Sequence, residues 1–386
     1  MSTSRRNFLS AGLAVPAAFS LNDAKKEPKE IGSSGPRLTY RPLGKTGLKV
    51  TTLGFGCMIT SDGSVIERAA DMGVNYFDTA RVYQSGNCER MVGAALKSRR
   101  KNLILSTKSL AQNQAGLLAD LDTSLRELQT DYVDIWYLHS KQRPSDVRDD
   151  MMEAQRIARK AGKVRFLGIS THGGQKELLP WVATQNHFDV VLTTYNFTMD
   201  KAVMDAAIDS IAKAGIGVVA MKVMAGGQKP LGITPSTDKT KEVLRREGGS
   251  LAALKWALRN PQIHTTIPSM VDNDQLEENM KAMLAPWSPA DEKVLAARLE
   301  EIGPLFCRYC GSCEGQCTKG LPVSDVLRAM MYADGYGEFA LGREQFHTLP
   351  ASLQRVRCGD CDECTVKCPN GVRVIERITR AQECFA

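Results

Sequence analysis

The chain lacks any long internal apolar run. Its 386 residues are 43% hydrophobic and 24% charged, as in ordinary globular proteins. No internal stretch approaches the roughly 18 apolar residues that a membrane-spanning helix needs. Blocks of one charge are also missing, because 50 Lys and Arg are spread among 43 Asp and Glu, for a net charge of +7. These absences predict a protein without a stable membrane span after processing, and they exclude nucleic acid as a favoured partner.

Cysteine is the abundant exception. Of the 11 cysteines, only Cys57, Cys88 and Cys384 lie outside two short runs near the C-terminus. The runs repeat the spacing x₂, x₂, x₃ of bacterial ferredoxins, and Pro369 follows the second, so we expect a ferredoxin-like domain with two 4Fe-4S clusters over residues 303–386. Zinc is the alternative metal for paired cysteines, but the cysteines of zinc ribbons have a different spacing. The fourth cysteine of each run is expected to bind the other cluster, which predicts the sets Cys307, Cys310, Cys313, Cys368 and Cys358, Cys361, Cys364, Cys317.

The N-terminus has the pattern of an export signal. Arg5-Arg6 is followed by Phe8 and Leu9, and an uncharged apolar run then continues to Leu21. This pattern is typical of the twin-arginine route, which carries folded proteins out of the cytoplasm. The alternative is a disordered basic start of a cytoplasmic protein. We therefore assign residues 1–21 to a signal and residues 22–37, which are polar, to a linker, and we expect a periplasmic or exported protein.

Between residues 38 and 302 the sequence alternates short apolar runs with helical patterns. Eight such runs predict eight parallel strands joined by crossover helices, and this number over about 260 residues favours a closed (β/α)₈ TIM barrel. An open doubly wound sheet is the alternative, but its Gly-rich dinucleotide fingerprint is missing after the first strand. Residues 40–50 predict a hairpin that covers the barrel floor. The strand candidates are residues 51–57, 74–79, 103–108, 132–139, 164–170, 190–196, 217–223 and 263–268.

Polar residues end three successive strands of this barrel. Asp78, Lys108 and His139 close the second, third and fourth apolar runs, and Tyr83 follows just after the second. Catalytic groups of TIM barrels lie at the C-terminal ends of the strands. One such residue alone is more often structural, whereas four together predict an active site.

These segments resemble the aldo-keto reductase family. The resemblance covers residues 38–302 and depends on the motifs around Asp78, Lys108 and His139. It implies reduction of an aldehyde or ketone, or the reverse oxidation, with hydride transfer from NADP(H) or NAD(H). Tyr83 is then the general acid, with its pKa lowered by Lys108, which Asp78 holds by an ion pair. A neutral His139 is expected to orient the carbonyl oxygen.

The resemblance also implies a set of cofactor contacts. Ser170 and Thr171 follow the fifth strand, and Tyr195 after the sixth is expected to stack on the nicotinamide. The later contacts belong to the loop that covers the pyrophosphate and to the site for the adenosine end. They are Lys222, Met224, Gly226, Ser269, Gln275, Glu278 and Asn279.

Two functional classes remain open at this point. The first is a carbonyl reductase acting on a small molecule, whose clusters serve a redox partner protein or a structural role. The second is a non-catalytic barrel that scaffolds an iron–sulfur electron carrier. Nicotinamide passes two electrons as a hydride, whereas each cluster takes one, and the sequence has no flavin motif to couple them.

The signal predicts a specific localisation result. Wild-type protein expressed in a bacterium with a twin-arginine system should appear in the periplasmic fraction, and Arg5→Lys with Arg6→Lys should keep it in the cytoplasm. Immunoblots of cell fractions, with a cytoplasmic marker as control, measure this. A wild-type protein that stays cytoplasmic with Met1 or Ser2 intact would remove the signal assignment.

Overall fold

The computed structural model describes residues 38–225 and 248–386, which belong to one compact unit, Pro36–Ala386. The predicted signal and linker lie outside the described residues. In the described part of the chain, no helix is long and apolar enough to cross a membrane.

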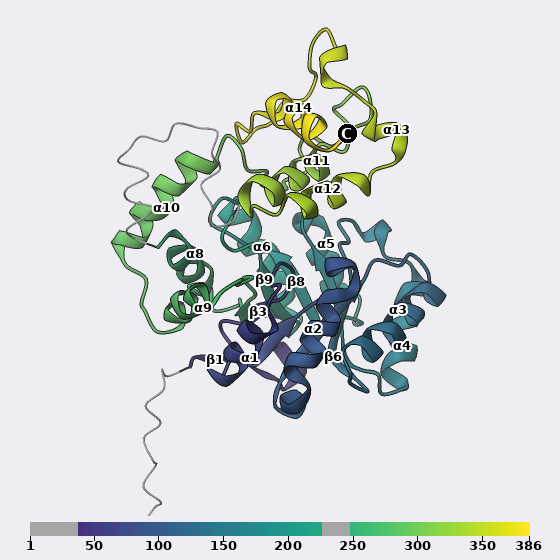
Figure 1. The fold of residues 1–386 in the computed structure, drawn as a ribbon, viewed down its shortest axis with the longest axis vertical. Coiled ribbons are helices and arrows are strands. Elements are labelled where there is room, and N and C mark those ends of the chain that lie inside the picture. The colour runs from purple at the N-terminus through teal and green to yellow at the C-terminus, as the bar shows by residue number, and fades with distance from the viewer. Residues whose placement is uncertain (1–37, 226–247) are drawn as a thin grey trace, which may run out of the picture. The chain divides into compact units, whose positions relative to one another are not determined.

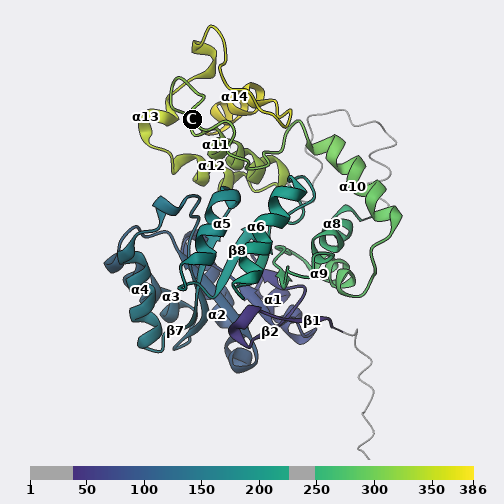
Figure 2. The same ribbon diagram turned by 180° about the vertical axis from the view of Figure 1, so that it is seen from behind.

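Eight parallel strands form the predicted barrel. In the sheet, each strand pairs with the next along the chain, and parallel bridges from Leu53 to Thr266 and from Gly56 to Ser269 join the first strand region to the last. Figures 1 and 2 show helices outside the strands when the barrel is viewed from either side. The strands are β3 (Phe55–Gly56), β4 (Tyr76–Asp78), β5 (Ile104–Ser109), β6 (Val133–Leu138), β7 (Val164–Thr171), β8 (Val190–Thr194), β9 (Gly217–Met221) and β10 (Thr265–Thr266).

The closing seam explains where the strands differ from the predicted ranges. At the seam, β3 and β10 are only two residues long, shorter than the apolar runs around them. Single backbone hydrogen bonds nevertheless continue across it, from the Gly54 amide to the Thr266 carbonyl (2.7 Å) and from the Gly56 amide to the Pro268 carbonyl (2.9 Å). The barrel is therefore closed, although regular pairing is interrupted there.

The helices of the barrel follow the expected alternation. Their ends coincide with capping residues, such as Asp200 before α6 and Ser288 before α10, whose side chains accept backbone N–H bonds. The helices are α1 (Gly63–Asp71), α2 (Asn87–Leu96), α3 (Gln114–Glu127), α4 (Asp149–Lys160), α5 (Gln175–Thr184), α6 (Lys201–Lys213), α8 (Gly249–Leu258), α9 (Asn273–Met280) and α10 (Pro289–Ile302).

The N-terminal hairpin covers the barrel floor, as predicted. Strands β1 (Tyr40–Pro42) and β2 (Lys49–Thr51) pair antiparallel. Leu43, Leu48 and Val50 pack into the same apolar cluster as side chains that fill the barrel, including Leu192 and Val219. The opposite end of the barrel is thus the end available for a site.

The segment after α10 is helical and contains no strand within its described residues. Its helices are α11 (Val323–Met330), α12 (Phe339–His347), α13 (Ala351–Gln354) and α14 (Val374–Phe385), and a π-helix, Met331–Gly335, follows α11 directly. They pack around an apolar core that includes Phe346, Ile378 and Phe385. The described residues give no evidence of the expected ferredoxin-like fold for this segment.

Gly168 in β7 is required by the packing of the barrel interior. A Cβ at this position would lie 2.3 Å from Cδ1 of Tyr137 on β6. The Tyr137 hydroxyl also forms a buried hydrogen bond with that of Tyr76 (2.8 Å), so the ring has little freedom to retreat.

We therefore expect Gly168→Ala to lower the free energy of unfolding by about 1–3 kcal/mol through overpacking. Urea denaturation followed by circular dichroism measures the change. The control is Gly63→Ala at the start of α1, where the nearest contact of the new Cβ is 3.4 Å and no clash arises. Equal stability of the two variants would contradict this packing argument.

Candidate active site

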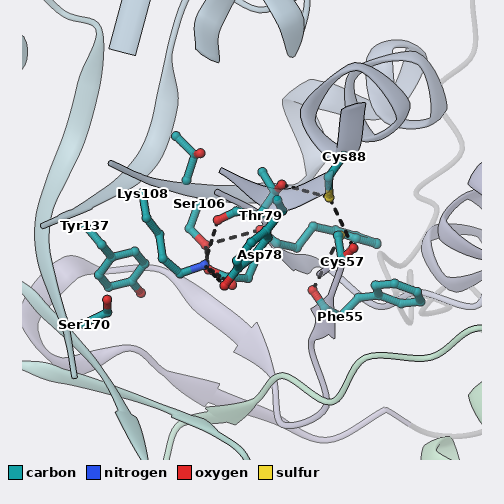
Figure 3. A network of polar contacts seen from close by, with 12 residues as sticks. Phe55, Cys57, Asp78, Thr79, Cys88, Ser106, Lys108, Tyr137 and Ser170 are labelled. Atoms are coloured by element: carbon teal, nitrogen blue, oxygen red, sulfur yellow. Dashed lines mark hydrogen bonds and ion pairs between the residues drawn. The ribbon is translucent and has the colours of Figure 1, made fainter. Parts of the chain in front are cut away.

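A buried ion pair between two neighbouring strands lies at the centre of the site. The Lys108 amine on β5 donates to Oδ2 of Asp78 at the end of β4, at 2.5 Å, and both residues are at most 2% exposed. Figure 3 shows the amine pointing at this carboxylate, which also accepts a hydrogen bond from the Ser106 hydroxyl (2.7 Å). Burial raises the pKa of Asp78, and Lys108 and Ser106 oppose that rise. The pair therefore holds both charged groups in fixed positions.

The Lys108 amine also contacts the Tyr83 hydroxyl. This amine donates to the Thr79 carbonyl (2.7 Å) and lies 3.3 Å from the Tyr83 hydroxyl. Tyr83 begins a short turn in which Gln84 has a left-handed φ of 50°. The side-chain amide of Gln84 donates to the Thr60 carbonyl (2.7 Å). This bond ties the turn to the loop after β3 and so fixes the phenol above the ion pair.

The pKa of Tyr83 differs from the expectation. Lys108 was expected to lower it, but burial raises the pKa well above its ordinary value, and the Asp78 carboxylate adds to the rise. The physical reason is that desolvation penalises the phenolate more strongly than one ammonium stabilises it, because that ammonium is already paired. Tyr83 is therefore fully protonated, as a proton donor must be before reaction.

His139 lies across from Tyr83 as a neutral imidazole. The two rings meet edge to face with centroids 6.0 Å apart. Burial lowers the pKa of His139 well below its usual value, and the cations Lys108, Arg328, Lys141 and Lys222 lower it further. Its Nδ1 has no hydrogen-bond partner among the described residues. The structure thus brings all four sequence-predicted catalytic residues together at the barrel mouth.

A cavity of about 180 Å³ opens in front of these groups. Asp78 and Tyr83 line it, and so do four of the predicted cofactor residues: Lys222, Met224, Ser269 and Gln275. The predicted residue Gly226 lies outside the described residues.

Three other predicted cofactor residues do not line this cavity. Two of them form hydrogen bonds within the barrel, and the third does not fit its expected role. The Ser170 hydroxyl accepts a bond from the Ser140 amide (2.9 Å), and the Thr171 hydroxyl bonds to Gly173 in its own loop. The Tyr195 ring lies 5.0 Å from that of Trp256 in the helix layer. Because Val190 and Leu192 of β8 face the barrel interior, alternation turns Tyr195 outward, and the expected stacking on nicotinamide does not fit this placement.

Asn279 on α9 has an unsatisfied amide. The residue is fully buried, and neither its amide nitrogen nor its oxygen has a hydrogen-bond partner among the described residues. Such a group costs free energy unless a ligand or water completes it. With Glu278 beside it on the same helix, it fits the predicted place for the adenosine end of a nucleotide.

Two of the three cysteines outside the runs, Cys57 and Cys88, are buried near the site. Cys88 accepts a hydrogen bond from the Thr79 hydroxyl (3.1 Å), and its thiol donates to the Cys57 carbonyl (3.2 Å), as Figure 3 shows. Burial raises the pKa of both thiols, which disfavours the reactive thiolate.

The eight cysteines of the runs gather in the two predicted sets. Burial raises the pKa of Cys307 to about 12, and the nearby Cys313, Cys310 and Cys368 thiols add to the rise. Burial likewise raises the pKa of Cys358, with contributions from its neighbours Cys364, Cys317 and Cys361. These last four cysteines also line one cavity of about 180 Å³. In the described part of the chain, however, no three or more His, Cys, Asp or Glu side chains converge in a geometry that holds a single metal ion.

Sequence reasoning missed the residues that the C-terminal segment contributes. Tyr336 and Glu338, which follow α11, line the same cavity as Tyr83. His172, after β7, also lines it, and its ring lies 6.4 Å from that of Tyr309. No sequence pattern had indicated these residues.

Comparisons with known proteins agree with this geometry. The model of the aldo/keto reductase family matches residues 61–297. A probable voltage-gated potassium channel subunit beta of Arabidopsis thaliana is 27% identical over 64% of this chain and 91% of its own length. L-glyceraldehyde 3-phosphate reductase of Escherichia coli is 26% identical over 64% of this chain and 88% of its own length. The structure of an aldo-keto reductase from Bacillus halodurans in its holo form has 26% identity and a TM-score of 0.58, covering 68% of this chain and 96% of that one.

The matched family range contains Asp78, Tyr83, Lys108 and His139 and ends before the first cysteine run. The barrel, the buried Asp78–Lys108 pair and these likenesses lead to one conclusion: the chain is an oxidoreductase that belongs to the aldo/keto reductase family.

Proposed function

We propose that the chain reduces an aldehyde or ketone with NAD(P)H, or oxidises the corresponding alcohol, with Tyr83 as the proton donor. The observation that carries this proposal is the Lys108 amine, which contacts both the Asp78 carboxylate and the Tyr83 hydroxyl at the edge of a cavity. Among relatives, L-glyceraldehyde 3-phosphate reductase is named for reduction of an aldehyde.

The residues suit the charges of such a reaction. A nicotinamide held beside these residues would supply the hydride, and negative charge would then develop on the carbonyl oxygen. Tyr83 transfers its proton to that oxygen, and the adjacent Lys108 ammonium stabilises the phenolate that remains. Neutral His139 is placed to donate a hydrogen bond to the same oxygen. In alcohol oxidation, the same groups act in the opposite direction.

The described residues also fit a nucleotide cofactor. Met224, Ser269 and Gln275 line the same cavity as Asp78 and Tyr83, and the unsatisfied Asn279 amide lies on the helix after β10. Members of the family typically use NADP(H), which supports the phosphorylated form. A non-catalytic scaffold, the other functional class, would leave a complete set of catalytic residues without a use.

We further propose that the C-terminal cysteines bind two 4Fe-4S clusters. Support comes from the cavity lined by Cys317, Cys358, Cys361 and Cys364, which draws its thiols from both runs in the way that ferredoxin spacing predicts. A single zinc ion needs four ligands about 2.0–2.3 Å from one point. A cubane would bind each thiolate through a different iron, so its four cysteine ligands would surround a volume and not a single point.

The clusters then have a structural role or serve a separate redox partner protein, since direct exchange with nicotinamide lacks a group that converts one-electron into two-electron steps. A signal in residues 1–21 would deliver the folded, loaded protein to the periplasm, where a tightly held cofactor or such a partner would sustain turnover.

The catalytic proposal predicts that Tyr83→Phe keeps the fold and lowers turnover of NADPH with carbonyl substrates by roughly 10²-fold or more. Lys108→Met should also be severely impaired, because it leaves the buried Asp78 carboxylate unpaired. Steady-state NADPH oxidation with a panel of carbonyls measures both. Tyr40→Phe, at an exposed position on the floor hairpin, is the matched control and should retain wild-type turnover. Unchanged turnover in Tyr83→Phe would remove Tyr83 from the donor role.

The cluster proposal predicts a brown protein with about eight iron and eight sulfide per chain after anaerobic purification. Cys317→Ala should damage the cluster built mainly by the second run, and iron and sulfide assays with electron paramagnetic resonance measure the loss. Cys384→Ala, which lies outside both sets, should keep the full content. Stoichiometric zinc without sulfide would refute the proposal.

A further inference from the structure

The C-terminal segment completes the wall of the catalytic cavity. Tyr336 and Glu338 of this segment line it together with Tyr83 of the barrel. The contact has an apolar core of its own, in which Tyr332 packs in the same cluster as Ala225 of the loop after β9. The stretch between the two cysteine runs is therefore part of the active site.

The C-terminal segment contacts Lys222, which lies directly after β9 in the barrel. The Lys222 amine lies 4.6 Å from the ring centroid of Tyr332 and 5.0 Å from that of Tyr336, and 3.5 Å from the Tyr332 hydroxyl. Within the described residues, no carboxylate forms an ion pair with it. Aromatic faces compensate for only part of the cost of desolvating an ammonium, so among the described residues this charge has no carboxylate counter-ion.

The backbone holds Lys222 in this position at a cost. Its φ of 56° is unusual for a residue with a side chain. The side-chain amide of Asn196 donates to the Lys222 carbonyl (3.1 Å) and so stabilises the turn. Backbone strain of this kind persists where the surrounding structure imposes it, often at functional sites.

The Lys222 charge acts on two histidines near the cavity, His139 and His172. After burial, the cations that most lower the pKa of His172 are Arg328 and Lys222, and both also act on His139. Arg328 bonds to Asp325 (2.7 Å), but its Nε has no partner among the described residues. Two buried cations therefore act on the His172 side of the cavity.

We propose that Lys222, held between Tyr332 and Tyr336, binds an anionic group on the carbonyl substrate, either a carboxylate or a phosphate. The inference rests on the proposed carbonyl reduction and names its substrate class. An anion here supplies the missing counter-charge and anchors the substrate at a point remote from the reacting carbon, which orients the carbonyl toward Tyr83 and His139.

Glu338 limits where this anion lies. Among the described residues, it is the carboxylate on the cavity wall besides Asp78, which Lys108 neutralises. It forms no ion pair with Lys222, so its charge repels an anion that approaches its side of the cavity. Glu338→Gln should therefore keep or increase the preference for anionic substrates, whereas Lys222→Met should decrease it.

The test compares anionic substrates with uncharged partners, of which the acid and its amide are matched in size. Terephthalaldehydic acid is paired with its uncharged amide, and glyceraldehyde phosphate with glyceraldehyde, which separates a carboxylate from a phosphate preference. In the wild type, kcat/KM should favour at least one anion over its neutral partner by roughly 10- to 100-fold, the scale of a hydrogen bond to a charged group. Lys222→Met should remove this ratio, and Lys222→Arg should restore most of it.

Calorimetry makes the test independent of turnover. The carboxylate arm titrates terephthalic acid monoamide and the uncharged diamide into the holoprotein, and the phosphate arm titrates glycerol phosphate and glycerol, with the fold of each variant checked by circular dichroism. Anion binding that Lys222→Met abolishes supports the inference even if no carbonyl is reduced, in which case only the proposed function fails. Equal kcat/KM and equal affinity for the anionic and neutral compounds in both arms overturn the inference. Weaker NADPH binding in Lys222→Met without a change in the anion ratio also overturns it and assigns Lys222 to the cofactor.

Discussion

The site depends on one buried ion pair, between Asp78 and Lys108. Parallel pairing of β4 with β5 places the two residues at the same end of the barrel, where water is excluded from both. Neither charge is tolerable there alone, since removing one partner of a buried pair typically costs about 3–5 kcal/mol. Tyr83 takes its chemical character from this pair, because the same ammonium that neutralises Asp78 also faces the phenol. The catalytic geometry is therefore a consequence of strand register and burial together.

A second constraint is that the barrel does not enclose its own site. The described wall includes Tyr336 and Glu338, which belong to a segment beyond the family's matched range. This cover has chemical consequences: burial keeps Tyr83 protonated and His139 neutral, and Arg328 of α11 reinforces the effect on His139. Excluding water strengthens every electrostatic interaction inside the cavity.

The cover is itself held by charge. Asp334 lies in the π-helix Met331–Gly335, between Tyr332 and Tyr336, and accepts hydrogen bonds from Arg377 (2.6 Å) and Arg380 (2.9 Å) of α14. Helix α14 also packs against the core that includes the cysteine side chains. The proposed clusters thus belong to the same folded unit as the cavity wall, and their integrity bears on the shape of the active site. Local π-helical geometry is frequent at functional sites, and here it sets the spacing of the two tyrosines around Lys222.

The sequence by itself determined the closed barrel, its floor hairpin and the meeting of Asp78, Tyr83, Lys108 and His139, because these features depend on local patterns: apolar runs, crossover helices and polar residues at strand ends. The expected stacking of Tyr195 on nicotinamide was wrong, because the tertiary structure turns its ring outward from β8. Only the tertiary structure decided the raised pKa of Tyr83, the aromatic cage around Lys222 and the participation of Tyr336 in the cavity. These properties arise from desolvation and from contacts between residues more than 100 positions apart, and no local pattern encodes either.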